Sequence, residues 1–165
     1  MRKVYLVIAV LILTACNPKP DTAPDVSTSG LYKVIGIKDG DTIELLKDGQ
    51  TEVVRLAEID CPEKAQAYGK KAKQFTADLC FGKYVKLAGD GKRDQYKRIV
   101  ATVIIDDTLN LNRELLKAGY AWHFKRYSNN NEYAVIEENA RAQHVGLWAD
   151  PMPEAPWHWR KDNHR

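Results

Sequence analysis

Three short segments of the sequence carry the residue types that chemistry at a phosphate requires. Residues 39–42 read Asp-Gly-Asp-Thr, which puts two carboxylates at a tight turn before a predicted strand. Residues 55–63 put an arginine in a predicted strand and an aspartate and a glutamate around the bend after it, where a proline restricts the backbone. Residues 96–98 add a second arginine at the start of a later strand. Phosphodiester hydrolysis needs a cation, donors that hold the phosphoryl oxygens and a group that orients the attacking water, and these segments contain candidates for each.

The pattern of apolar residues predicts the elements that must position these segments. Strands are predicted at residues 31–38, 42–46, 51–59, 83–88 and 99–105. A helix is predicted at residues 68–80, where Ala72, Phe75, Thr76, Leu79 and Cys80 share one face. Two more helices, at residues 110–117 and 131–144, are each followed by a glycine stop. Five strands with a helix between the third and the fourth is the order of an OB-fold. The predicted fold class is therefore α+β, a five-stranded OB-fold barrel with about three α-helices.

The N-terminus has the pattern of an export signal. Two basic residues precede an apolar run at residues 4–13, which is shorter than the roughly 20 residues that cross a bilayer. The sequence Leu-Thr-Ala-Cys that ends at Cys16 resembles a bacterial lipobox, so Cys16 is expected to carry the lipid that holds the mature protein on a membrane. A plain cleaved signal, with Cys16 incidental, is the alternative. We expect an exported lipoprotein, on the outer membrane and facing the periplasm if the organism is Gram-negative.

The chain is predicted to contain one folded domain. Residues 1–15 are assigned to the signal peptide, 16–30 to the lipidated cysteine and a flexible tether, 31–150 to the OB-fold domain and 151–165 to an aromatic and basic tail. The tail could contact nucleic acid or pack across the barrel, and packing is favoured. We expect a monomer.

Charge alone does not identify a partner. The formal net charge is +3, and removal of Arg2 and Lys3 with the signal leaves +1, so only local clusters indicate anion binding. One cluster follows the second motif and another surrounds the third, and each is either a phosphate-contacting surface or a solvated face. The members are Lys64, Lys70, Lys71 and Lys73, and Lys92, Arg93, Lys97 and Arg98.

Two cysteines remain once Cys16 is assigned to lipid. Cys61 and Cys80 belong to a chain that is expected to leave the reducing cytoplasm, so a disulfide between them is predicted. Two buried thiols are the alternative, because sequence does not tell whether the two Cα atoms approach closely enough. The four histidines have no zinc-ligand spacing and are expected to be structural or exposed.

Together, the three motifs resemble those of the staphylococcal (micrococcal) nuclease family. D-G-D-T, R-L-x-x-I-D-C-P-E and D-x-Y-x-R follow one another in the family's order with about its spacing, and the match covers roughly residues 33–148. The resemblance implies a Ca²⁺-dependent endonuclease that cuts DNA and RNA with low sequence preference and leaves 3′-phosphate ends.

The resemblance also implies a role for each motif residue. Ca²⁺ would be bound by the carboxylates of Asp41 and Asp60 and by the backbone carbonyl of Cys61, which stands where the best-known member has threonine. The catalytic residues would be Arg55 and Arg98, which hold the phosphoryl group, and Glu63, which orients or deprotonates the attacking water. Tyr96 would contact the nucleotide phosphate. A second nucleotide-contacting tyrosine of the family aligns near Lys125, where Phe124 or Tyr127 could replace it.

Two other classes of function remain open at this point. One is a non-catalytic OB-fold lipoprotein that binds nucleic acid without cutting it. The presence of Asp41, Arg55, Asp60, Glu63 and Arg98 together argues against it, since non-catalytic relatives lack the acids or the arginines. The other is an envelope lipoprotein that binds protein partners through the barrel, which nothing beyond the anchor supports.

Overall fold

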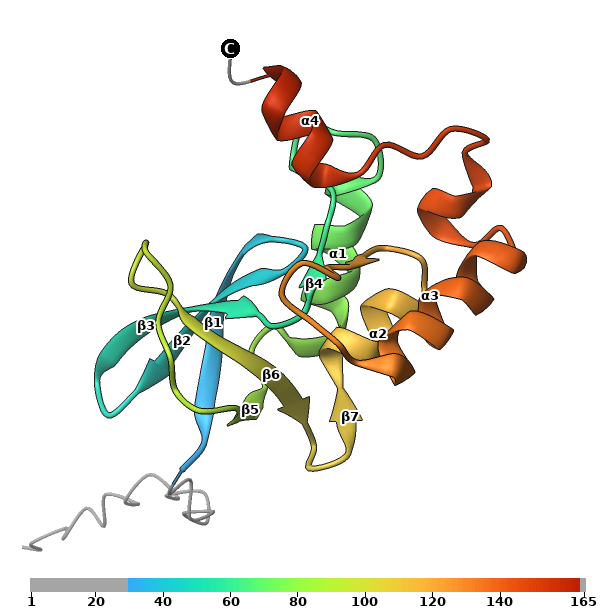
Figure 1. Cartoon of the computed structure of the whole chain (residues 1–165). Helices are drawn as coiled ribbons and strands as arrows, with labels where there is room; N and C mark the ends of the chain where they lie inside the picture. Colours follow the sequence, from blue (N-terminus) through green and yellow to red (C-terminus); the bar gives the residue numbers. More distant parts are fainter. Residues whose placement is uncertain (1–29, 164–165) are drawn as a thin grey trace, which may run out of the picture.

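The computed structural model describes residues 30–163. The predicted signal peptide, Cys16 and most of the tether fall on residues 1–29 and lie outside the described residues, as do residues 164–165. The strands are β1 (Tyr32–Asp39), β2 (Thr42–Lys47), β3 (Gln50–Leu56), β4 (Ile59–Asp60), β5 (Tyr84–Ala88), β6 (Ile99–Ile105), β7 (Leu109–Asn110) and β8 (Trp122–His123). The helices are α1 (Gly69–Cys80), α2 (Leu111–Lys117), α3 (Asn131–Ala142), the 3₁₀ helix η1 (Gly146–Ala149) and α4 (Pro156–Asn163) (Figure 1).

Five strands close into a barrel. They are hydrogen-bonded in the order β3-β2-β1-β5-β6, and β6 returns to pair with β3. The closing pair is parallel, with residues 54–56 opposite residues 99–101, whereas the other pairs are antiparallel. α1 connects the third and fourth barrel strands, which is the OB-fold order, so the predicted α+β barrel is confirmed.

The barrel is filled by side chains that alternate along its strands. In β6 every second residue from Ile99 to Ile105 is buried, as a period of two requires when one face of a strand meets the core. α1 and α2 pack against the barrel strands with their apolar faces, and Ala72, Thr76 and Cys80 of α1 are fully buried as predicted. These helices therefore fix the barrel end from which the first two motifs emerge.

The third predicted strand, residues 51–59, is wrong at its C-terminal end. β3 ends at Leu56, and Glu58 has a φ of 64°, a left-handed conformation that breaks the strand before β4 begins. The break is held from three sides: the Ala57 N–H donates to Ala101, the Ala57 carbonyl accepts from Asn112, and the Phe124 N–H donates to the Glu58 carbonyl. β4 can therefore leave the barrel and pair with β8, which turns Asp60 toward the arginine of β3.

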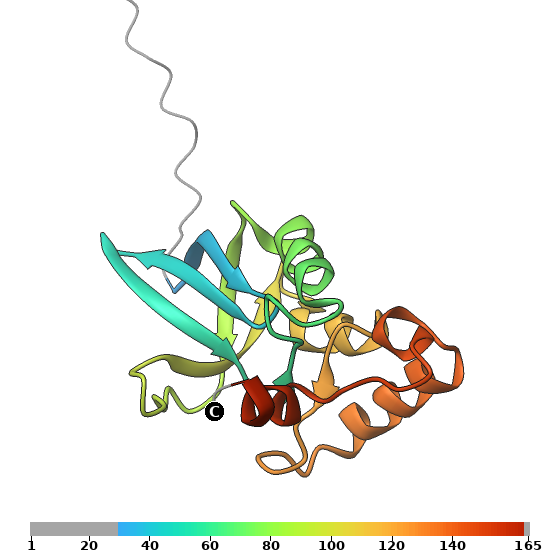
Figure 2. The ribbon, with the colours of Figure 1, turned by 90° about the horizontal axis from the view of Figure 1, so that it is seen from above.

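Residues 30–163 contain four α-helices instead of about three. The additional helix is α4, which lies in the segment that the sequence marks only as an aromatic and basic tail. Its Trp157 ring stacks on Phe124 with centroids 5.2 Å apart and meets Trp122 edge-on at 5.5 Å. The tail therefore packs on the domain, and both views place α4 beside the segment that follows β4 (Figures 1 and 2). No helix within residues 30–163 is long and apolar enough to span a bilayer.

The predicted disulfide between Cys61 and Cys80 is wrong in this structure, which has both as buried free thiols. Cys61 lies beside Ala72, because a Cβ placed on Gly40 would be 2.8 Å from the Cβ atoms of both. Cys80 is eight residues farther along α1, about 12 Å at 1.5 Å per residue. Bridged cysteines need Cα atoms roughly 4.4–6.8 Å apart, so the helix keeps the two thiols separate.

Candidate active site

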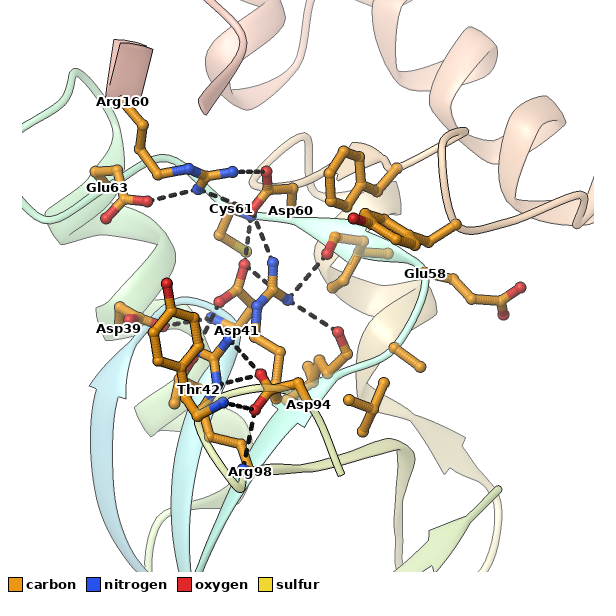
Figure 3. Close-up of a pocket in the computed structure, with 18 of the residues that line it drawn as sticks. Asp39, Asp41, Thr42, Glu58, Asp60, Cys61, Glu63, Asp94, Arg98 and Arg160 are labelled. Atoms are coloured by element: carbon orange, nitrogen blue, oxygen red, sulfur yellow. Dashed lines mark hydrogen bonds and ion pairs between the residues drawn. The ribbon is translucent and has the colours of Figure 1, made fainter. Parts of the chain in front are cut away.

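A pocket with a volume of about 700 Å³ opens beside the break between β3 and β4. The pocket is lined by the end of β1, the start of β2, the end of β3, β4 with the residues after it, the 94–98 loop and one residue of β6 (Figure 3). Phe124 and Tyr127, from the segment after β8, and one residue of α4 complete the lining. It brings together all seven residues predicted from the motifs, which are Asp41, Arg55, Asp60, Cys61, Glu63, Tyr96 and Arg98.

Arg55 lies between the two aspartates of the first two motifs. Its Nη2 donates to Asp60 Oδ1 at 2.7 Å, and its Nη1 lies 3.1 Å from Asp41 Oδ2. Nη1 also donates to the backbone carbonyls of Leu56 and Ile59, each at 2.9 Å. Because these carbonyls flank the strand break, the same backbone turn that bends the chain also fixes the guanidinium.

The Asp41 carboxylate is buried at the floor of the pocket. Its Oδ2 accepts the Cys61 N–H at 2.6 Å, and its Oδ1 accepts the Thr42 hydroxyl at 3.3 Å. Burial raises the pKa of Asp41 to about 8, against the attraction of Arg55, which lowers it. A carboxyl with this pKa holds a proton at neutral pH unless a cation takes the proton's place. Burial likewise raises the pKa of the Cys61 thiol, which keeps that group protonated and unsuited to nucleophilic attack.

Arg98, the second arginine, is held by Asp94 of the third motif. Arg98 donates through Nε and Nη2 to Asp94 Oδ2, at 2.7 and 2.6 Å, and Asp94 Oδ1 also accepts the backbone N–H groups of Tyr96 and Arg98. The Tyr96 ring is 70% exposed and lies 5.2 Å from the Arg98 guanidinium carbon. This exposure favours contact of Tyr96 with a bound molecule over packing in the core.

Glu63 stands at the upper edge of the pocket, and its partner is a residue that the sequence does not indicate. Arg160 of α4 donates through Nη1 to Glu63 Oε1 at 2.6 Å and through Nη2 to Asp60 Oδ2 at 2.7 Å (Figure 3). The only sequence signal for Arg160 is the basic and aromatic composition of the tail, because no motif spacing links residue 160 to residue 60.

The charges around the pocket suit a cation. Six carboxylates and three guanidinium groups line it, a formal excess of three negative charges. Within residues 30–163 no group of three or more histidine, cysteine, aspartate or glutamate side chains is arranged to hold a metal ion. Asp41 and Asp60 would thus need a backbone carbonyl and water to complete a coordination shell. Carboxylate, carbonyl and water oxygens are the ligands that Ca²⁺ takes, so the donor set fits that ion.

The two basic clusters differ in how far their charges are already paired. Lys92 and Arg93 form ion pairs with Asp90 and Glu52, the latter with two hydrogen bonds of 2.8 and 2.9 Å. These two residues are therefore better described as a solvated face. Lys64, Lys70 and Lys71 surround a shallow hollow near Tyr68 and have no ion pair among the described residues, which favours anion contact there.

Comparison with known proteins identifies the family of this chain. The family model for staphylococcal nuclease homologues matches residues 53–150. A Haemophilus influenzae protein described as an uncharacterized endonuclease is 42% identical over 164 residues, which cover 97% of this chain and 86% of the relative. An Escherichia coli protein with the same description is 38% identical, covering 78% of this chain and 83% of the relative. A Shigella flexneri micrococcal nuclease is 37% identical, covering 78% and 79%. The chain therefore belongs to the staphylococcal nuclease family and is a nuclease, a hydrolase that acts on phosphodiester bonds.

Proposed function

We propose that this nuclease is a Ca²⁺-dependent endonuclease that cleaves both DNA and RNA with little sequence preference and leaves 3′-phosphate ends. The observation that carries the proposal is the pairing, in one pocket, of two buried aspartates with two arginines and a glutamate that reaches the same opening. A module that only binds nucleic acid has no need of buried, destabilising carboxylates.

Asp41 and Asp60 would hold the cation, with the Cys61 carbonyl as the third protein ligand. When bound, Ca²⁺ supplies positive charge where negative charge grows on the phosphate. The ion would also offset the burial of Asp41, whose pKa of about 8 reports an unfavourable carboxylate in the metal-free protein.

Arg55 and Arg98 approach the pocket from β3 and from the start of β6, so they would hold two sides of a phosphoryl group. Planar guanidinium groups donate in pairs to phosphate oxygens, and carboxylate partners fix both side chains before substrate arrives. Glu63 would orient or deprotonate the attacking water. Its Oε2 has no hydrogen-bond partner within residues 30–163 and is free to accept from water.

Digestion of supercoiled plasmid and of single-stranded RNA by the full-length chain in nonionic detergent tests this proposal. Both substrates should be degraded with Ca²⁺ and remain intact with EGTA, and the Arg55→Ala, Glu63→Ala double variant should be inactive. A matched control is Arg113→Ala, Glu132→Ala, which removes one arginine and one glutamate from an exposed ion pair outside the pocket. Products should block primer extension until a phosphatase removes the 3′-phosphate. Binding without cutting would replace this proposal with the non-catalytic module.

We also propose that the protein is exported and anchored by lipid at Cys16. The proposal rests on the residues around Cys16 alone: two basic residues, the apolar run at 4–13 and the Leu-Thr-Ala-Cys sequence. Labelled palmitate should be incorporated into the wild type and not into Cys16→Ser, which should also leave the membrane fraction. Equal labelling of both would contradict the assignment.

A further inference from the structure

The helix α4 contributes a side chain to the pocket from the far end of the chain. Arg160 bridges Glu63 and Asp60, with Nη1 also 3.3 Å from Asp60 Oδ1, so one guanidinium joins the glutamate to a buried aspartate. Asp60 is 1% exposed and already accepts from Arg55, which makes it a fixed support. The side chain of Glu63 is 33% exposed, and within residues 30–163 its carboxylate forms an ion pair only with Arg160.

The tail is also tied to the backbone of Glu63. The Gln66 side chain accepts the Glu63 N–H through Oε1 at 3.1 Å and donates through Nε2 to the Glu154 carbonyl at 2.7 Å. One glutamine amide therefore joins the Glu63 loop to Glu154, two residues before α4 begins. Gln66 is itself buried, so this link is protected from water.

The start of α4 is anchored on the other side by aromatic packing. Ala155 and Pro156 are buried, and Trp157 stacks on Phe124 beside the pocket. Trp157 and Arg160 are three residues apart on one helix and share a face, so fixing the tryptophan also aims the arginine. Together these contacts give Arg160 a defined position.

From this geometry, and resting on the function proposed above, we propose that Arg160 is a positioning residue that holds the Glu63 carboxylate over the pocket. Both of its Nη atoms donate to carboxylates, one to Glu63 and one to Asp60, so the guanidinium links the two acidic residues. The bridge fixes Glu63 Oε1 and leaves Oε2 toward the attacking water. α4 thereby becomes part of the active site and not merely a packed tail.

Three variants of the full-length chain test the role of Arg160. Arg160→Gln should lower kcat about 10- to 100-fold and change KM less than about twofold, because misplacement of a reacting group by about 1 Å costs up to about 100-fold. Arg160→Lys should recover only part of kcat, since one ammonium does not bridge two carboxylates as a fork does. Lys161→Gln, which removes the same charge from the next, exposed position of α4, should keep wild-type kinetics.

Coupling to Glu63 distinguishes positioning from a general structural effect. In a Glu63→Gln background, adding Arg160→Gln should lower kcat by less than about twofold, because the group that it positions is gone. In metal-free protein with EGTA, the ¹³C shift of the Glu63 carboxyl should move in Arg160→Gln and stay unchanged in Lys161→Gln. Calorimetry with Ca²⁺ alone should give Arg160→Gln an affinity no lower than that of the wild type, because the substitution removes a positive charge from beside Asp60.

Each other result overturns a defined part of the account. A raised KM with unchanged kcat would make Arg160 a substrate-binding residue, and tighter Ca²⁺ binding with higher activity would make it a competitor of the cation. Wild-type kinetics in Arg160→Gln would show that Arg160 does not position Glu63. The same conclusion would follow if Arg160→Gln lowered kcat as much in the Glu63→Gln background as in the wild type. If the wild type cuts nothing, the proposed function fails and this inference fails with it; if the wild type cuts and the variants do not differ, only this inference fails.

Discussion

Replacing Asp41 with asparagine should stabilise the metal-free protein at neutral pH. The carboxyl group is buried and its pKa is raised to about 8, so at neutral pH the folded protein must take up a proton that the unfolded chain does not bind, which costs free energy. Asparagine has nearly the same shape and can still accept the Cys61 N–H, while its amide can donate to the Thr42 hydroxyl, which now donates to Asp41. The substitution thus replaces the titrating group with a neutral one and keeps the hydrogen bonds.

The size and the pH range of the effect follow from the two pKa values. The pKa in the folded state, about 8, lies above the value of 3.8 for an aspartate in water, so the folded protein holds this proton more tightly than the unfolded chain. The contribution of Asp41 to stability is therefore largest below pH 4 and is lost as the pH rises from about 4 to about 8. At 1.36 kcal/mol per unit the loss is about 4 kcal/mol at pH 7. This is a large share of the roughly 5–15 kcal/mol that stabilises a domain.

Urea unfolding in EGTA at several pH values measures this directly. The difference in free energy of unfolding between Asp41→Asn and wild type should be near zero at pH 4 and grow to about 4 kcal/mol at pH 7. Added Ca²⁺ should shrink the difference at pH 7 by stabilising only the wild type. Asp106→Asn, at an exposed position, is the control and should show no trend. A difference that is flat with pH, or that favours the wild type at pH 7, would refute the reasoning.

Three further predictions concern the pocket's supports. Gly69→Ala should destabilise the fold by about 1–3 kcal/mol, because the added Cβ would lie 1.8 Å from the Glu63 carbonyl oxygen and must push that loop away. The loss of kcat, converted to free energy, should exceed the loss of stability, and urea unfolding together with a measurement of kcat checks this. Trp157→Ala should lower kcat about as much as Arg160→Gln and speed amide exchange in residues 156–163, whereas protection like that of the wild type would contradict the anchoring role. Arg55→Lys should lower kcat at least about 100-fold, since a lysine does not reproduce the fork that spans both aspartates; recovery of activity at high Ca²⁺ would argue that Arg55 only supports the cation site.

The residues of the three motifs could be located from the sequence because their signals are local. Asp41 sits at a turn before a predicted strand, Arg55 lies in a predicted strand, and Asp60 and Glu63 flank Pro62 just after it. The apolar face of α1 likewise followed from a period of 3.6: Ala72, Thr76 and Cys80 are buried, whereas Phe75 and Leu79 are half-buried.

Other features depended on contacts that are distant in the sequence. The break at Glu58 is stabilised by hydrogen bonds to Ala101, Asn112 and Phe124, none of which the β-like composition of residues 51–59 shows. Arg160 reaches Asp60 because Trp157 finds a stacking partner, a tertiary contact without a spacing rule. The separation of the two cysteines likewise depends on where α1 docks.

The central claim is that the two buried aspartates hold a cation without which the phosphodiester is not cut. Calorimetry on the full-length protein should give a Kd for Ca²⁺. The Ca²⁺ concentration of half-maximal cleavage should equal that Kd when it is measured on the same protein with a short, saturating DNA substrate and a buffered concentration of free Ca²⁺. Asp60→Asn should weaken both quantities by the same factor. Cleavage that persists in EGTA, or Ca²⁺ binding that Asp60→Asn leaves unchanged, would contradict the account.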